Sequence, residues 1–174
     1  MRRCTVLMTW VLTLASAALL SPSSVAAEGG QGQITADLEG RSIPPTEVGR
    51  YFCHDFEYPH IRCFSSAREL EAASGDGNDA SGWMVAPYGS GDYLTVYSEP
   101  SYAGTYAHLS QNYDGLWAIG WNDRIRSFKA RNGISGSFYT DWYASGSRYD
   151  FCCNSSVPVL TSAYDRAFSS VYRD

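Results

Sequence analysis

The chain has 174 residues, of which 44% are hydrophobic and 14% aromatic, and its formal net charge at pH 7 is −5. A chain of this length can bury a hydrophobic core of ordinary size. The acidic balance, together with the lack of any cluster of basic residues, argues against nucleic acids and anionic membranes as partners.

The first 27 residues are predicted to be a secretory signal peptide. Arg2 and Arg3 give a positively charged start, the stretch 5–20 is uncharged, and Val25-Ala26-Ala27 is a typical cleavage site of small residues. The apolar stretch is too short for a membrane-spanning helix. We therefore expect a secreted, extracellular protein that does not insert into a membrane once the signal is removed.

The segment after the signal is predicted to be a flexible linker, and the next segment to be ordered. Residues 28–46 contain Gly, Gln and Pro with scattered acidic residues and show no pattern of a core. Residues 47–91 are expected to form an N-terminal hairpin and a short helix. Ser66 and Glu69 have the spacing of a capping box, which predicts a helix that buries Leu70.

Four cysteines lie beyond the predicted signal, at positions 53, 63, 152 and 153. An even number in an oxidising compartment predicts two disulfide bridges, which allow three connectivities. A Cys53–Cys63 bridge across the hairpin would leave Cys152 and Cys153 to form a bridge between adjacent residues, which is strained and uncommon. The alternative is that the hairpin is linked to the end of the chain through Cys152 and Cys153.

The C-terminal half contains an internal repeat. Residues 97–104 and 139–146 correspond to each other, and each stretch ends in a Gly, Gly104 or Gly146. A short polar loop follows in each unit, Asn122–Ser127 and Asp165–Ser170. A repeat of this length is one supersecondary unit that cannot bury its apolar face alone, so we expect the two units to pack together.

These patterns resemble the βγ-crystallin superfamily over residues 92–174. Its Greek-key unit has an aromatic-x4-aromatic-x-Gly hairpin, matched by Tyr97, Tyr102 and Gly104, and a loop of the form Asn/Asp-Asn/Asp-x-x-Ser/Thr-Ser. The resemblance implies an all-β fold in which two Greek-key motifs, about 92–133 and 134–174, pack as a sandwich of two sheets.

The resemblance also implies calcium sites that the two loops share. One loop supplies an acid or amide, and the fifth-place Ser or Thr of the other loop completes the site. The main candidate ligands are Asn122, Asp123 and Ser169, and the weaker ones are Glu99, Asp141 and Asp165. The alternative is that these residues only stabilise turns.

Three departures from the family pattern lie in the second site and the second hairpin. Arg126 stands where a Ser or Thr ligand belongs, Arg166 follows Asp165, and Ala144 replaces the second aromatic residue. A guanidinium repels Ca²⁺ and does not lose its proton. We therefore expect at most one Ca²⁺ site.

No catalytic constellation is found, so the protein is not expected to be an enzyme. His54 and His60 lie beside Cys53 and Cys63, but their spacing fits no common zinc module. The predicted function is that of a secreted, non-enzymatic structural or binding module.

The expected partner is an unknown protein or a glycan. Two alternative functions are compatible with the same fold. A protease inhibitor would use an exposed, disulfide-braced turn, for which residues 57–60 are the candidate. An antimicrobial or cell-wall-binding protein would use exposed aromatic residues such as Trp117, Trp121 and Trp142.

Overall fold

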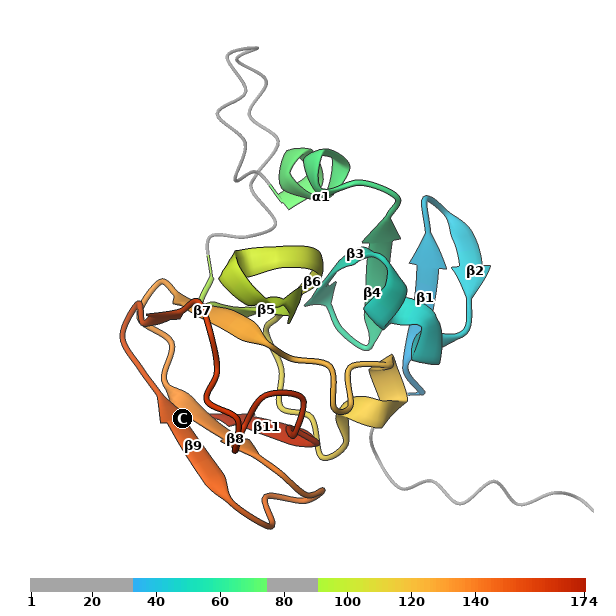
Figure 1. Ribbon diagram of the computed structural model, residues 1–174. Coiled ribbons are helices and arrows are strands. Elements are labelled where there is room, and N and C mark those ends of the chain that lie inside the picture. Colours follow the sequence, from blue (N-terminus) through green and yellow to red (C-terminus); the bar gives the residue numbers. More distant parts are fainter. Residues whose placement is uncertain (1–32, 75–90) are drawn as a thin grey trace, which may run out of the picture. The chain divides into compact units, whose positions relative to one another are not determined.

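The computed structural model describes residues 33–74 and 91–174, which belong to one compact unit (Figure 1). The predicted signal peptide lies outside these residues. Among the helices of the described part, none is both long and apolar enough to cross a bilayer.

The described residues form two β-sheets with few, short helices, as predicted. The large sheet has the strand order β10-β7-β5-β6-β3-β4-β1-β2, and the small sheet has the order β11-β8-β9. The strands are β1 (Thr35–Leu38), β2 (Arg41–Ile43), β3 (Phe52–Glu57), β4 (His60–Phe64), β5 (Tyr93–Glu99), β6 (Ala103–Leu109), β7 (Ser127–Arg131), β8 (Gly136–Tyr139), β9 (Arg148–Phe151), β10 (Ser156–Val157) and β11 (Ser170–Arg173). The helices are α1 (Ala67–Ser74) and the 3-10 turns η1 (Pro45–Arg50), η2 (Pro100–Tyr102) and η3 (Leu116–Ile119).

Each repeated unit contributes a backbone pairing to the sheet of the other unit. Strand β10 of the second unit pairs with β7 of the first, and Tyr113 of the first unit forms a β-bridge with Val171 in β11. Strand β10 is the third strand of its unit, and β11 returns to pair with β8, which is the long return connection typical of a Greek key. The predicted fold class, two Greek keys packed as a sandwich with an N-terminal hairpin and helix, is confirmed.

The core lies between the two sheets, as the alternating pattern of the strands requires. Its largest fully buried side chains include Trp121, Phe128, Phe138 and Phe168, with the rings of Phe138 and Phe168 stacked at 4.4 Å. Trp121 is therefore a core residue, and its predicted place on an exposed aromatic surface is wrong. Complete burial removes the large apolar surface of this ring from water, which favours a position in the core.

The prediction of a flexible linker over residues 28–46 is wrong for the part that the structure describes. Strands β1 and β2 form an antiparallel hairpin, and β1 also pairs in parallel with β4. Ala36, Leu38 and Ile43 are buried in the main core. Two short strands with one apolar side each have little signal of their own, and the long-range pairing with β4 stabilises them.

The helix α1 begins at the predicted capping box. The backbone N–H of Glu69 donates to Ser66 Oγ at 3.3 Å, and the backbone N–H of Ser66 donates to Glu69 Oε2 at 3.1 Å. Leu70 is completely buried, as expected. It packs beside Tyr97 and Tyr106 in a second, smaller apolar cluster on the outer face of the large sheet.

The N-terminal hairpin continues the sheet of the first Greek key instead of forming a separate segment. Strand β3 pairs in parallel with β6, where His54 lies opposite His108. Asp55 is buried and accepts hydrogen bonds from the backbone N–H of Ser110 at 2.6 Å and from the Tyr113 hydroxyl at 2.8 Å. Burial raises the pKa of Asp55, while the hydrogen bonds from Ser110 and Tyr113 oppose that rise.

The turns η1 and η3 meet at two glycines. A Cβ on Gly49 would collide with the carbonyl oxygen of Gly120, and a Cβ on Gly120 would collide with that of Thr46. Gly120 also has a positive φ of 67°. This close backbone approach joins the N-terminal segment to the first Greek key.

One of the two predicted disulfides is present. Cys53 and Cys63 lie opposite each other in the β3–β4 pair and form the local bridge. Cys152 and Cys153 are free thiols on the surface, so the prediction of a second bridge is wrong for this structure. They follow β9 in the small sheet, Cys53 and Cys63 are already bonded to each other, and a bridge between the adjacent Cys152 and Cys153 would be strained.

Candidate functional site

The hairpin of the first unit has the geometry that its motif predicts. The rings of Tyr97 and Tyr102 meet edge to face with centroids 5.5 Å apart. Gly104 has a φ of 76°, and a Cβ there would collide with Ser98 Oγ. The aromatic contact and the glycine together shape the turn that precedes β6.

The second hairpin repeats this backbone although its aromatic pair is incomplete. Tyr143 and Ala144 have φ values of 55° and 56°, like Ser101 and Tyr102 in the first unit, with φ of 57° and 61°. Gly146 corresponds to Gly104, with a φ of 78°. Ala144 lacks the aromatic ring that the motif has at this position, but the backbone of the turn has the same conformation.

The last serine of each loop fastens the hairpin of its own unit. Ser127 Oγ donates to the carbonyl of Glu99 at 2.7 Å and accepts from the N–H of Tyr102. In the second unit, Ser170 Oγ donates to the carbonyl of Asp141 at 2.7 Å. These buried serines therefore have a structural role.

The two loops contact each other through a reciprocal pair of hydrogen bonds. The N–H of Asp123 donates to the carbonyl of Phe168 at 3.0 Å, and the N–H of Arg166 donates to that of Ile125 at 3.1 Å. Asp123 and Arg166 both have positive φ, 54° and 58°. The crossed pairing of the loops, which a shared site needs, is thus present.

The three main candidate ligands lie around one hollow of about 490 Å³. Asn122 and Asp123 come from the first loop and Ser169 from the second, and Asp141 joins them from the second hairpin. Thr140, Trp142 and Tyr143 complete the lining, and none of them is among the predicted ligands. Glu99 and Asp165, the other weaker candidates, do not line this hollow.

The polar atoms of the hollow are mostly oxygens. Asn122 Nδ2 donates to Asp123 Oδ2 at 2.6 Å, and Trp142 Nε1 lies 3.4 Å from Asn122 Oδ1. Burial raises the pKa of Asp123, and the hydrogen bond from Asn122 partly offsets that rise. Carboxylate, amide and hydroxyl oxygens are the donors that Ca²⁺ prefers.

Arg126 occupies the position that corresponds to the second site. Its Nε and one terminal nitrogen donate to the two carboxylate oxygens of Asp165, at 3.0 and 3.3 Å. Its other terminal nitrogen donates to Glu99 Oε2 at 2.9 Å. The guanidinium thus lies between the two acidic side chains, and the hydrogen bonds to Asp165, together with the charges of both carboxylates, raise its pKa.

The other sequence-based candidates make contacts within the fold. In the turn between β3 and β4, Tyr58 packs against Tyr113, and His60 contacts Thr35 and Asp37 of β1, while Pro59 at its tip is exposed. His54 is buried and stacked on Phe56. Within residues 33–74 and 91–174, no group of three or more His, Cys, Asp and Glu side chains is arranged to hold a metal ion.

Comparisons with known proteins return similarity in structure alone. No family model matches the sequence, and no curated protein is significantly similar to it. Among solved structures, the chain is similar to a βγ-crystallin from Ciona intestinalis, with 20% identity, 47% of this chain and 99% of that chain covered, and a TM-score of 0.43. It is similar to an archaeal βγ-crystallin, with 22% identity, 49% and 100% covered, and a TM-score of 0.44. A βγ-crystallin domain from Clostridium beijerinckii has 22% identity, 47% and 95% covered, and a TM-score of 0.42.

At these identities the likeness concerns the fold alone. The Greek-key arrangement of the chain is independently visible in the exchanged strand β10, the Tyr113 bridge and the repeated hairpins.

Proposed function

We propose that the protein is a secreted, non-enzymatic structural or binding module with a single Ca²⁺ site. The observation that carries this proposal is the hollow in which Asn122 and Asp123 of the first loop meet Ser169 of the second. The set of donors fits a hard divalent cation, since it combines carboxylate, amide and hydroxyl oxygens. A bound Ca²⁺ would join the two Greek keys at the point where their loops cross.

The second, corresponding site is not proposed to bind metal. Arg126 already neutralises Glu99 and Asp165, and its guanidinium would repel a divalent ion. The expected stoichiometry is therefore one Ca²⁺ per chain.

Calorimetric titration of chelator-treated protein with Ca²⁺ tests the proposal. We expect one binding event and a rise in the melting temperature, since a ligand at a hundredfold excess over its Kd stabilises the folded state by about 2.7 kcal/mol. Ser169→Ala should weaken the event with little effect on the metal-free melting temperature. The absence of both heat and thermal shift at millimolar Ca²⁺ would contradict the proposal.

Ser127→Ala is the matched control. Ser127 fastens the first hairpin and does not line the hollow, so its loss should lower the metal-free stability by about 1 kcal/mol. Binding of Ca²⁺ should remain unchanged. If both serine variants weaken binding equally, the effect is one of stability and Ser169 is not a ligand.

Glycan binding is a second candidate, because two tryptophans remain exposed beside the hollow. Trp117 and Trp142 are 56% and 52% exposed, and their rings lie 6.5 Å apart. Exposed aromatic pairs of this kind serve as contact surfaces. If the wild-type protein is retained on chitin or cell-wall glycan and the double variant Trp117→Ala/Trp142→Ala is not, the result would support this function. Equal retention of the wild type and the double variant would exclude a role of the two tryptophans.

A further inference from the structure

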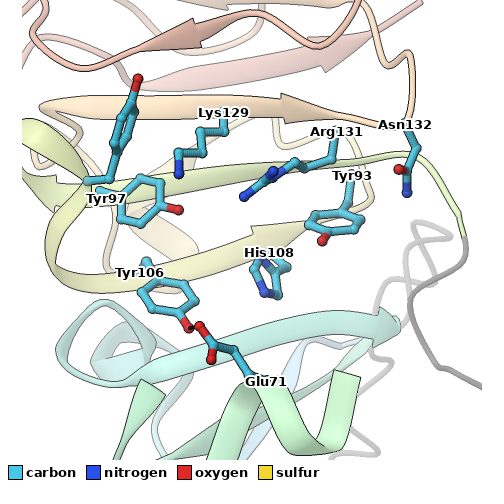
Figure 2. Close-up of a pocket in the computed structure, with 9 residues that line it drawn as sticks. Glu71, Tyr93, Tyr97, Tyr106, His108, Lys129, Arg131 and Asn132 are labelled. Carbon is cyan, nitrogen blue, oxygen red and sulfur yellow. Dashed lines mark hydrogen bonds between the residues drawn. The ribbon is translucent and has the colours of Figure 1, made fainter. Parts of the chain in front are cut away.

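A second and larger pocket, of about 620 Å³, lies on the outer face of the large sheet. Its position follows from the period of two in the strands: Leu94 and Val96 of β5 belong to the main core, while Tyr93 and Tyr97 line the pocket. Figure 2 shows Lys129 and Arg131 of β7 on the same face, with Glu71 of α1 facing them across β5 and β6.

Tyrosine rings form much of the pocket. The ring of Tyr97 lies 5.5 Å from that of Tyr102 and 5.3 Å from that of Tyr106. All three line the pocket, and the Tyr106 hydroxyl donates to Glu71 Oε1 at 3.3 Å (Figure 2). Such rings combine a flat apolar surface with a polar edge, which suits a ligand that is part apolar and part polar.

Two cations lie beside these rings. Lys129 is the only lysine of the chain, and its Nζ lies 4.1 Å from the centroid of Tyr102. Burial and the nearby charge of Arg131 lower the pKa of Lys129. Among the described residues, neither cation forms an ion pair. The pocket is therefore a local cationic site on a chain of net negative charge.

His108 adds a buried polar group to the wall of the pocket. Its side chain is only 5% exposed, and Nδ1 lies 3.0 Å from Thr95 Oγ1. Nε2 has no hydrogen-bond partner among the described residues. A neutral ring whose Nδ1 accepts the Thr95 hydroxyl carries its proton on Nε2, which is then a buried N–H without a partner at the wall of the pocket.

We propose that this pocket binds an anionic saccharide, that is, a sugar ring bearing a carboxylate, sulfate or phosphate group. The C–H groups of the sugar would pack on the tyrosine rings, and the anionic group would pair with Lys129 and Arg131. His108 Nε2 and Glu71 would bind hydroxyl groups. The pocket volume lies in the range of small-molecule sites. The pocket shares no lining residue with the hollow that Asn122, Asp123 and Ser169 line.

The single lysine allows a direct test. Reductive methylation with a ¹³C label gives one lysine resonance, which reports on the pocket in the intact protein. Its shift is followed on addition of oligogalacturonate, a heparin disaccharide or glucose 6-phosphate, which distinguish carboxylate, sulfate and phosphate. A neutral disaccharide and inorganic phosphate serve as controls. We expect at least one anionic saccharide to move the resonance, with an affinity that falls as salt increases, and neither control to do so.

A charge-removing variant completes the test. Lys129→Gln/Arg131→Gln should lower the affinity of that saccharide, measured by calorimetry, about tenfold or more. Arg41→Gln, which removes an exposed cation on β2, should leave it unchanged, and melting temperatures check that both variants fold. Three outcomes would each overturn the proposal: no anionic saccharide moves the resonance, inorganic phosphate or the neutral sugar binds equally well, or the double variant retains full affinity.

Discussion

The guanidinium of Arg126 donates two hydrogen bonds to the carboxylate of Asp165, which belongs to the other Greek key. Glu99, at the end of β5, pairs with the same guanidinium. One arginine of the first unit thus neutralises an acidic residue of each unit. The hollow of the first site is different. Among the residues that line it with Asn122, Asp123 and Ser169, none is an arginine or a lysine.

Replacing Arg126 should change the number of Ca²⁺ ions that bind. In Arg126→Ser, Glu99 and Asp165 lose their shared cation, so we expect a lower melting temperature in chelator. Addition of Ca²⁺ should restore it and give a second event in the calorimeter, larger still with Arg166→Asn. An unchanged stoichiometry and melting temperature in Ca²⁺ would mean that these loops are turns and not ligands.

Removing one hydroxyl should weaken the attachment of the N-terminal hairpin. Tyr113→Phe deletes the 2.8 Å hydrogen bond to the buried carboxylate of Asp55 while keeping the ring. We expect the free energy of unfolding to fall by about 1–3 kcal/mol, because a buried acceptor loses a partner. Tyr164→Phe is the control, since its hydroxyl bonds to the exposed Arg148 carbonyl. Equal losses in the two variants, measured by urea unfolding, would argue against a special role of Asp55.

The cysteines should separate into two classes. Alkylation of the folded protein followed by peptide mapping should label Cys152 and Cys153, which are exposed thiols, and leave Cys53 and Cys63 unlabelled until a reductant is added. Loss of the bridge in Cys53→Ala/Cys63→Ala should cost about 2–4 kcal/mol of stability, whereas Cys152→Ser/Cys153→Ser should cost little. Resistance of Cys152 and Cys153 to labelling before reduction would show that they are bridged in solution.

Acid should destabilise the protein through its buried histidines. Burial, with the charges of His54 and Arg131, lowers the pKa of His108 to about 3, from an ordinary value of 6.5. Between these two values the unfolded chain binds a proton that the folded chain does not, so stability falls as the pH decreases. The slope is about 1.4 kcal/mol per pH unit for one such group. His54, with a pKa of about 4, acts in the same direction.

Urea unfolding at pH 7, 6 and 5 measures this slope. His108→Gln should reduce the slope by the contribution of one histidine, about 1.4 kcal/mol per pH unit. Asp55 has the opposite sign, since its raised pKa favours the folded state as the pH decreases, so the difference between the slopes of the wild type and His108→Gln is the measure of His108. A slope that His108→Gln leaves unchanged would show that His108 does not contribute.

The sequence alone determined the features that depend on local chemistry. Tyr97, Tyr102 and Gly104 predict their hairpin because the aromatic contact and the positive φ act within eight residues. Ser66 and Glu69 predict the start of α1 for the same reason. Repetition of the hairpin and loop then indicates two Greek keys, since neither unit can bury its apolar face alone.

Only the tertiary structure decided which residues meet across long distances in the chain. The sequences of β1 and β2 are short and predict a linker. In the folded protein β1 pairs with β4, and this long-range pairing makes the segment part of the sheet. Trp121 is predicted to lie on an exposed aromatic surface, but the fold buries it completely. The tyrosine pocket unites α1, β5, β6 and β7, so no single segment indicates it. Burial and pairing of this kind depend on contacts that the fold brings together, and local preferences are too weak to specify them.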